Sequence, residues 1–330
     1  MSVLTETAAA LVSGGKGILA ADESIGTMSS RLEAAGVAPT EENRRAYREM
    51  LVTTPDLADG VSGVIFCDET LRQRLSDDRP FPQAMQDLGI LPGIKVDTGA
   101  KPLPGSPGDA VTEGLDGLFP RLQEYVTLGA RFAKWRGVIT IDRTRPSVAA
   151  VRSNAHALAR YASACHQAGL VPIVEPEVLM TGSHSMARCR EVTARVLQAV
   201  AQELRSFGVD LAATVLKPNM VLPGSSSGEH ASPDVVAQAT VGVLIEQMPA
   251  ELAGVAFLSG GQSPRGATAN LAAMQPLPSP WPLTFSFGRA LVDPALAAWR
   301  GEADLIEAGQ QALSERTSAN SAVLTGSAVV

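Results

Sequence analysis

Hydrophobic residues gather along the chain in eight short runs that begin about 29 to 44 residues apart. Nearly every position within a run is apolar, as in parallel strands that are buried on both faces. The runs cover residues 17–21, 61–66, 93–96, 132–141, 170–174, 211–216, 254–258 and 283–287. The pattern therefore predicts eight parallel strands.

Several intervals between the runs have the spacing of amphipathic helices. The clearest of these intervals are residues 147–167, 185–207, 232–247 and 294–316. Proline suits the first turn of a helix, and Pro146, Pro233 and Pro294 stand near three of the predicted starts. Alternating strands and helices favour an α/β fold, a single (β/α)8 TIM barrel domain over residues 1–330, rather than two doubly wound domains.

Two further patterns bear on domain organisation. No GxGxxG fingerprint follows any of the runs, which argues against a dinucleotide-binding domain. Residues 317–330 are small and weakly patterned, so we expect a C-terminal tail that is flexible or docked on the barrel.

Composition narrows the class of protein. Hydrophobic residues make up 45% of the chain and charged residues 18%, which excludes a mostly disordered chain. A chain with a net charge of −7 is expected to bind nucleic acid and anionic membranes poorly. No apolar run is long enough for a membrane span. Three scattered cysteines form no CxxC pair, and no basic leader precedes the first run. We therefore expect a cytoplasmic protein with reduced thiols.

Lysine is scarce in this chain, with five residues against 22 arginines. Three of the five, Lys95, Lys134 and Lys217, lie in or at the end of predicted strands. A lysine amine can lose its proton and attack a carbonyl, whereas a guanidinium stays protonated. These lysines are therefore candidates for chemistry rather than for ordinary surface charge.

Polar residues recur where the predicted strands end. In a barrel these ends meet at one mouth, and alternate residues of each strand point inward. This alternation brings together Asp22, Lys95, Asp97, Lys134, Arg136, Glu175, Glu177 and Lys217, and the last two strands end at the same mouth in Ser259-Gly260-Gly261 and Ser286-Phe287-Gly288-Arg289. A charged group on a buried strand is costly unless it is paired. Such a cluster is either structural or an active site, and its size favours an active site.

The chemistry that this set supports is amine catalysis. An apolar strand and a nearby ammonium at Lys134 would both lower the pKa of Lys217, so that its free amine attacks a ketone. The resulting protonated imine withdraws electrons, and a neighbouring C–C bond can break. Glu175 and Glu177 can carry the protons, and Asp22 can stabilise the iminium or orient a substrate hydroxyl.

The loops after the last two strands suggest an anionic substrate. Ser259-Gly260-Gly261 and Gly288-Arg289 offer backbone N–H groups, a hydroxyl and a guanidinium, and barrels often bind phosphate at these two loops. Lys95 and Arg136, across the mouth, are suited to hold a second anion. The sequence thus predicts a substrate that carries phosphate.

Longer stretches around these residues resemble one family. They include GKGILAADES (15–24), EENRRAYRE (41–49), GIKVDTG (93–99), FAKWR (132–136), VPIVEPE (171–177), LKPNMV (216–221), FLSGGQS (257–263) and TFSFGRAL (284–291). The chain resembles class I fructose-1,6-bisphosphate aldolases, the Schiff-base type, from about residue 15 to about 320. The resemblance implies a lyase of glycolysis and gluconeogenesis that cleaves fructose 1,6-bisphosphate reversibly. It also implies a (β/α)8 barrel, a homotetramer, and no need for a metal or other cofactor.

The same resemblance assigns roles to individual residues. Lys217 is then the Schiff-base lysine and Glu175 the main acid/base, while Glu177, Lys134 and Asp22 assist at the imine and at the C4 hydroxyl. The residues that match the C1-phosphate side are Ser259, Gly260, Gly288 and Arg289, with Arg31 as a further contributor, and Ser286 is a further candidate for binding the substrate or its phosphates. Those that match the C6-phosphate side are Lys95, Arg136, Ser24 and Thr27.

The chain also departs from the family pattern. Ser30 and Thr98 stand where lysine is common, which removes positive charge near the phosphates. Animal members carry a tyrosine on a C-terminal tail that exchanges the enamine proton, whereas the tyrosines here are Tyr47, Tyr125 and Tyr161. We expect a water or a site carboxylate to serve at that step.

Three alternative functions compete with a Schiff-base fructose-bisphosphate aldolase. A metal-dependent aldolase needs clustered histidine and carboxylate ligands, and the four histidines of this chain are scattered without an HxxxH or HxH spacing. A non-enzymatic barrel protein would be marked by loss of Lys217 or Glu175, and both are present. A Schiff-base lyase that acts on another sugar phosphate stays open.

Overall fold

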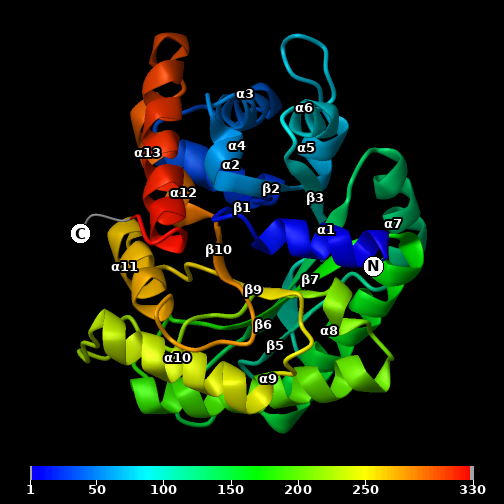
Figure 1. Cartoon of the computed structure of the whole chain (residues 1–330), viewed down its shortest axis with the longest axis vertical. Helices are drawn as coiled ribbons and strands as arrows, with labels where there is room; N and C mark the ends of the chain where they lie inside the picture. Colours follow the sequence, from blue (N-terminus) through cyan, green and yellow to red (C-terminus); the bar gives the residue numbers. More distant parts are fainter. Residues whose placement is uncertain (1, 328–330) are drawn as a thin grey trace.

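The centre of the molecule is a closed barrel of eight parallel strands, seen in a computed structural model that describes residues 2–327 (Figure 1). The barrel strands are β1 (Gly17–Ala21), β2 (Val61–Phe66), β3 (Leu91–Lys95), β6 (Phe132–Ile139), β7 (Val171–Val178), β8 (Val215–Leu216), β9 (Gly254–Phe257) and β10 (Leu283–Phe287). Each pairs with the next along the chain, except that β4 (Ala100–Pro102) and β5 (Ala110–Thr112) form a separate antiparallel hairpin, and β1 closes on β10. The predicted (β/α)8 fold is confirmed.

Strand ends differ most from prediction in β8 and β7. The predicted run 211–216 begins as a short 3-10 turn, η1 (Leu211–Ala213), because the Asp210 carboxylate caps the N–H of Ala212 at 3.0 Å. Within this run, only the two residues of β8 pair with the neighbouring barrel strands. In contrast, β7 continues beyond residue 174, so Glu175 and Glu177 lie within a strand that pairs with β6.

The barrel interior is apolar below the mouth. Inward-facing residues form one cluster with the first helix, α1 (Val3–Val12). Its barrel members are Ile18, Ala20, Ile65, Phe132, Val171, Ile173, Val215 and Ala256. Leu11 packs against Gly63 of β2, and Val12 against Gly254 at the start of β9, so α1 covers the N-terminal end of the barrel. Polar inward residues are left to the opposite, C-terminal end.

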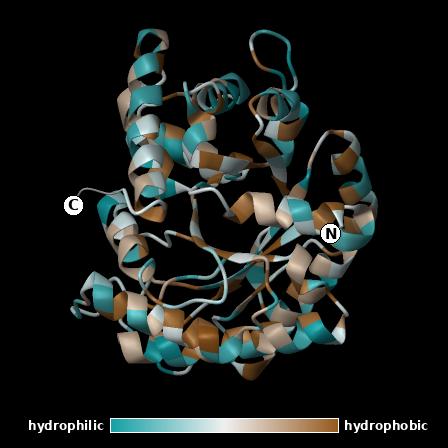
Figure 2. Ribbon diagram, viewed as in Figure 1, coloured by the Kyte–Doolittle hydropathy of each residue, from teal (hydrophilic) through white to brown (hydrophobic). Residues whose placement is uncertain are grey.

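Helices surround the strands and bury a second, larger core between the two layers. They are α2 (Ile25–Ala34), α3 (Glu41–Val52), α4 (Leu57–Gly60), α5 (Asp68–Arg72), α6 (Phe81–Asp87), α7 (Leu118–Thr127), α8 (Val148–Ala168), α9 (Met186–Ser206), α10 (Pro233–Gln247), α11 (Pro264–Met274), α12 (Arg289–Trp299) and α13 (Ile306–Leu324). Figure 2 shows apolar segments in the barrel and mixed polarity on the helices around it. Trp135 packs outward on Tyr161 of α8, with ring centroids 5.6 Å apart, so its neighbours Lys134 and Arg136 face inward as predicted. None of the helices within residues 2–327 has the length and apolarity needed to cross a membrane.

The predicted helix 294–316 is wrong, because this stretch belongs to two helices. Left-handed backbone at Arg300 (φ 50°) and Gly301 (φ 80°) ends α12, and α13 begins after the turn η2 (Ala303–Leu305). Pro294 lies inside α12 rather than in its first turn, and the Ala290 carbonyl that it leaves free accepts from Arg316 Nε of α13 at 3.4 Å.

The other two prolines and the C-terminal tail agree with prediction only in part. Pro233 begins α10 as predicted, whereas Pro146 precedes the N-cap Ser147 and stands outside α8. Residues 317–324 are the last turns of α13, with Thr317 and Asn320 buried, so this part of the expected tail is a docked helix. Residues 328–330 of that tail lie outside the described residues.

Candidate active site

A cavity of about 640 Å³ opens at the C-terminal ends of the barrel strands. All the site residues that the sequence predicted line it: Asp22, Ser24, Thr27, Arg31, Lys95, Lys134, Arg136, Glu175, Glu177, Lys217, Ser259, Gly260, Ser286, Gly288 and Arg289. These residues come from seven loops or strand ends, so the barrel brings them together from distant parts of the sequence.

Two lysines and two carboxylates form a connected row in the cavity. Lys217 Nζ lies 3.3 Å from Glu175 Oε1, and Lys134 Nζ lies 3.1 Å from Glu175 Oε2. Lys134 Nζ also lies 2.6 Å from Asp22 Oδ2. Lys217, Lys134 and Glu175 are only 3%, 3% and 4% exposed, so these charges interact away from bulk water.

The two buried lysines differ in their acidity. Burial lowers the pKa of Lys217, and the nearby Lys134 ammonium lowers it further against the opposing effect of Glu175. Burial alone would also lower the pKa of Lys134, but Asp22 and Glu175 together raise it. Lys134 therefore stays charged, and Lys217 is the amine that loses its proton more readily.

The carboxylates of the row are ionised. Burial alone would raise the pKa of Glu175, but Lys134 and Lys217 hold it below its usual value. Burial would also raise the pKa of Asp22, but nearby lysines, Lys134 foremost, outweigh this effect and lower the pKa to about 2. Glu175, next to the Lys217 amine, is thus a carboxylate ready to accept a proton.

One side of the cavity is formed by the loops after β9 and β10. Gly260 and Gly261 have φ angles of +48° and +81°, a left-handed pair that side chains disfavour and that leaves backbone N–H groups free to face an anion. Gly288 caps α12, so the first N–H groups of this helix and the exposed Arg289 lie at the cavity. These features suit a phosphate group.

Another part of the cavity wall, formed by residues in or just after β1, β3 and β6, carries hydroxyl groups and paired cations. The Ser24 hydroxyl caps α2, accepting from Thr27 N at 3.3 Å, so this helix also begins at the cavity. Lys95 Nζ lies 2.7 Å from Asp97 Oδ1, and Arg136 forms an ion pair with Glu177. The cations on this side are therefore already balanced by carboxylates.

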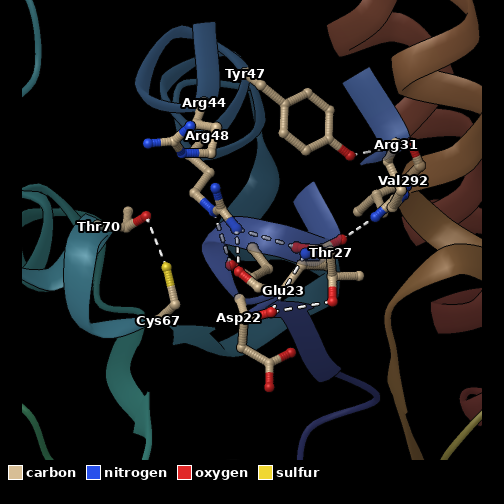
Figure 3. A network of polar contacts seen from close by, with 12 residues as sticks. Asp22, Glu23, Thr27, Arg31, Arg44, Tyr47, Arg48, Cys67, Thr70 and Val292 are labelled. Atoms are coloured by element: carbon tan, nitrogen blue, oxygen red, sulfur yellow. Dashed lines mark hydrogen bonds and ion pairs between the residues drawn. The ribbon is translucent and has the colours of Figure 1, made fainter. Parts of the chain in front are cut away.

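Two lining residues, Asp97 and Glu23, had no predicted role in the site. Asp97 joins Lys95 to the backbone of Arg136, whose N–H donates to Asp97 Oδ2 at 3.1 Å. Asp97 stands two residues after Lys95, so the alternation of a strand predicts that both side chains face the mouth of the barrel. Glu23 forms ion pairs with Arg31 and Arg48 (Figure 3), and no strand periodicity indicates it because it follows the end of β1.

The arrangement of possible metal ligands bears on the chemistry of the site. Within residues 2–327, no three His, Cys, Asp or Glu side chains form a group that could hold a metal ion. The charged residues of the cavity alternate in sign, which suits ion pairing and proton transfer.

Comparison with known proteins agrees with this geometry. The model of the family "fructose-bisphosphate aldolase class-I" matches residues 3–329. A probable class 1 fructose-bisphosphate aldolase of Xanthomonas campestris is 54% identical over 90% of this chain and 89% of its own length. Fructose-bisphosphate aldolase B of Gallus gallus is 49% identical over 98% of this chain and 90% of its own.

A solved structure extends the match to three dimensions. Fructose-bisphosphate aldolase from Plasmodium falciparum superposes with a TM-score of 0.97 at 42% identity, and the match covers 99% of this chain and 95% of that one. The family model, the related sequences and the solved structure all match nearly the whole length of this chain. The chain belongs to the class I fructose-bisphosphate aldolase family.

Proposed function

We propose that this chain cleaves fructose 1,6-bisphosphate reversibly to dihydroxyacetone phosphate and glyceraldehyde 3-phosphate through a Schiff base on Lys217. The observation that carries the proposal is the buried Lys217 amine, 3.3 Å from an ionised Glu175 and in one cavity with the Lys134 ammonium. Membership of the class I family supports the same reaction.

The first half of the reaction builds the imine. The free amine of Lys217 attacks the C2 ketone, and the nitrogen passes a proton to Glu175. The C2 oxygen takes up one proton from solvent to become a hydroxyl. Glu175 then returns the nitrogen proton to this hydroxyl, which leaves as water, and the protonated imine remains. Lys134, charged and bound to Asp22, stabilises the oxygen on which negative charge develops.

The second half breaks the C–C bond. A carboxylate, Glu175 or Glu177, removes the C4 hydroxyl proton, and the C3–C4 electrons move into the iminium to give an enamine and an aldehyde. A proton supplied by water or by a site carboxylate converts the enamine back to the imine. Water then adds to C2, and the ketose product leaves with Lys217 restored as the amine.

The two phosphates of this substrate suit the two sides of the cavity. Ser259, Gly260, Ser286, Gly288 and Arg289 would hold the C1 phosphate, with Arg31 close by. Lys95, Arg136, Ser24 and Thr27 would hold the C6 phosphate. Because Lys95 and Arg136 are paired with carboxylates, the C6 side should attract phosphate less strongly than the C1 side.

Membership of the family also supports a proposal for the location, oligomeric state and pathway of the enzyme. We propose a cytoplasmic homotetramer that acts in glycolysis and gluconeogenesis and needs no cofactor. An Arabidopsis thaliana relative named as a cytosolic fructose-bisphosphate aldolase is 48% identical over 98% of this chain, which supports the location.

Trapping the covalent intermediate tests the proposed function directly. Borohydride added with dihydroxyacetone phosphate reduces an imine to a stable amine, so we expect one labelled lysine, Lys217, in peptide mass spectra. Borohydride alone is the control and should leave the lysine unlabelled. Label on another residue, or no label, would contradict the proposal.

Chelation tests the expected independence from metal. Because the described residues hold no metal-binding group, dialysis against EDTA should change the cleavage rate by less than about twofold. Loss of activity that added zinc restores would show that a metal takes part.

A further inference from the structure

Arg48 is a buried charge that the reaction described above does not use. It lies on α3, is fully buried, and belongs to the EENRRAYRE stretch (41–49). A buried guanidinium is costly unless its N–H groups find acceptors. The acceptors that it does find are therefore informative.

Arg48 holds the chain on both sides of Asp22 (Figure 3). Its Nε donates to the Ala21 carbonyl at 3.0 Å, and its Nη2 donates to the Glu23 carbonyl at 2.8 Å. The same Nη2 lies 3.4 Å from Glu23 Oε2, and the other oxygen of that carboxylate pairs with Arg31. One side chain thus binds the residues immediately before and after Asp22.

Asp22 needs such support because it stands just beyond the strand. The barrel pairing of β1 ends at Ala21, which is in register with Phe66 of β2, so no barrel pairing holds the backbone of Asp22. Its carboxylate nevertheless meets Lys134 Nζ at 2.6 Å. A shift of about 1 Å at such a contact can change a rate by about 100-fold.

The geometry also explains why this position carries arginine. The planar fork of a guanidinium presents N–H groups in fixed directions and can reach two carbonyls two residues apart. A lysine ammonium is a single point donor on a flexible stem. A hydrophobic residue would fill the space but hold neither carbonyl.

We propose that Arg48 is a positioning residue that fixes Asp22 against Lys134, and so keeps the row of charges around Lys217 in its active arrangement. The proposal rests on the proposed function, since it gives Asp22 a part in the reaction. Arg48 itself lies outside the set of residues that line the cavity.

A double-mutant cycle in the full-length enzyme tests this proposal. We expect Asp22→Asn to lower kcat by about 100-fold or more. Arg48→Met and Arg48→Lys should lower it by about 10- to 100-fold with less than about a threefold change in KM. In the Asp22→Asn background, either Arg48 substitution should cost less than about threefold, because the residue that Arg48 positions is already disabled.

Arg44 provides the matched control. It lies one turn earlier on α3, is also largely buried, and pairs with Glu69 at 2.6 Å; its other hydrogen bonds go to Ser29 and Pro39 rather than to β1. Arg44→Met should change kcat by less than about threefold with or without Asp22→Asn. Melting temperatures and the folded fraction are measured for every variant, so a general loss of stability is separated from a loss of turnover.

Several results would overturn the proposal. One is a kcat loss for Arg48→Met that is equally large in the Asp22→Asn background. Another is a wild-type kcat in Arg48→Lys, which keeps the charge and serves as the test variant if Arg48→Met does not fold. Failure of the wild-type enzyme to form the borohydride adduct would instead refute the proposed function, so the two failures are distinguishable.

Discussion

Replacing Lys217 with arginine is expected to lower kcat for fructose 1,6-bisphosphate cleavage by about 10⁴-fold or more. A guanidinium keeps its proton and cannot add to the C2 ketone, so the imine pathway is lost rather than slowed. The fold should survive, because the Glu175 carboxylate beside this position can pair with the new guanidinium. Steady-state cleavage rates and the thermal midpoint measure these two outcomes separately.

The control for this substitution is another lysine of the same chain. Lys101 is exposed on the hairpin strand β4, so Lys101→Arg should leave both rate and stability close to wild type. The Lys217 variant should also give no adduct with borohydride and dihydroxyacetone phosphate. A rate near the native one in Lys217→Arg would assign the nucleophile to a different residue.

Much of the site was predictable because its signals are local. Strands buried on both faces appear as continuous apolar runs, and the bounds of β1, β2 and β10 coincide with three of them. The two-residue alternation of a strand then separates Lys134 from Trp135, and the structure places the first in the cavity and the second against α8.

What the sequence did not indicate depends on contacts between distant residues. Glu23 is a site residue because Arg31 and Arg48 meet it in space, and nothing in its own neighbourhood marks it. Similarly, Pro294 is tolerated inside α12 where Arg316, on a later helix, binds the carbonyl that proline leaves free. Local patterns predict elements and their inward faces, and they do not predict such partners.

The two buried lysines show how one cavity gives the same side chain two roles. Lys134 has two carboxylates, Asp22 and Glu175, within 3.1 Å and keeps its charge. Among the described residues, Glu175 is the one carboxylate within ion-pair distance of Lys217 Nζ, at 3.3 Å, and the Lys134 ammonium further lowers the pKa of Lys217. The number of carboxylates at each nitrogen therefore divides the lysines into a fixed cation and a nucleophile.

This division predicts the effect of removing the fixed cation. Lys134→Met should lower kcat/KM at pH 7 by about 100-fold or more and move the acidic limb of its pH profile to higher pH. Lys134 lowers the pKa of Lys217, so without it that pKa rises and less free amine exists at a given pH. Lys134 also lowers the pKa of Glu175, so the carboxylate form of Glu175 is likewise reached only at higher pH. Both changes have the same sign, so the loss should be smaller at pH 9 than at pH 7.

Two variants separate the effect of charge from that of side-chain loss. Lys134→Arg keeps a positive charge near Asp22 and Glu175, so its acidic limb should stay near that of the wild type even though its turnover falls. Lys101→Met makes the same substitution at an exposed position and should change neither rate nor profile. An acidic limb that stays in place or moves to lower pH in Lys134→Met would contradict the assignment, because the positive charge would then not be what keeps Lys217 unprotonated.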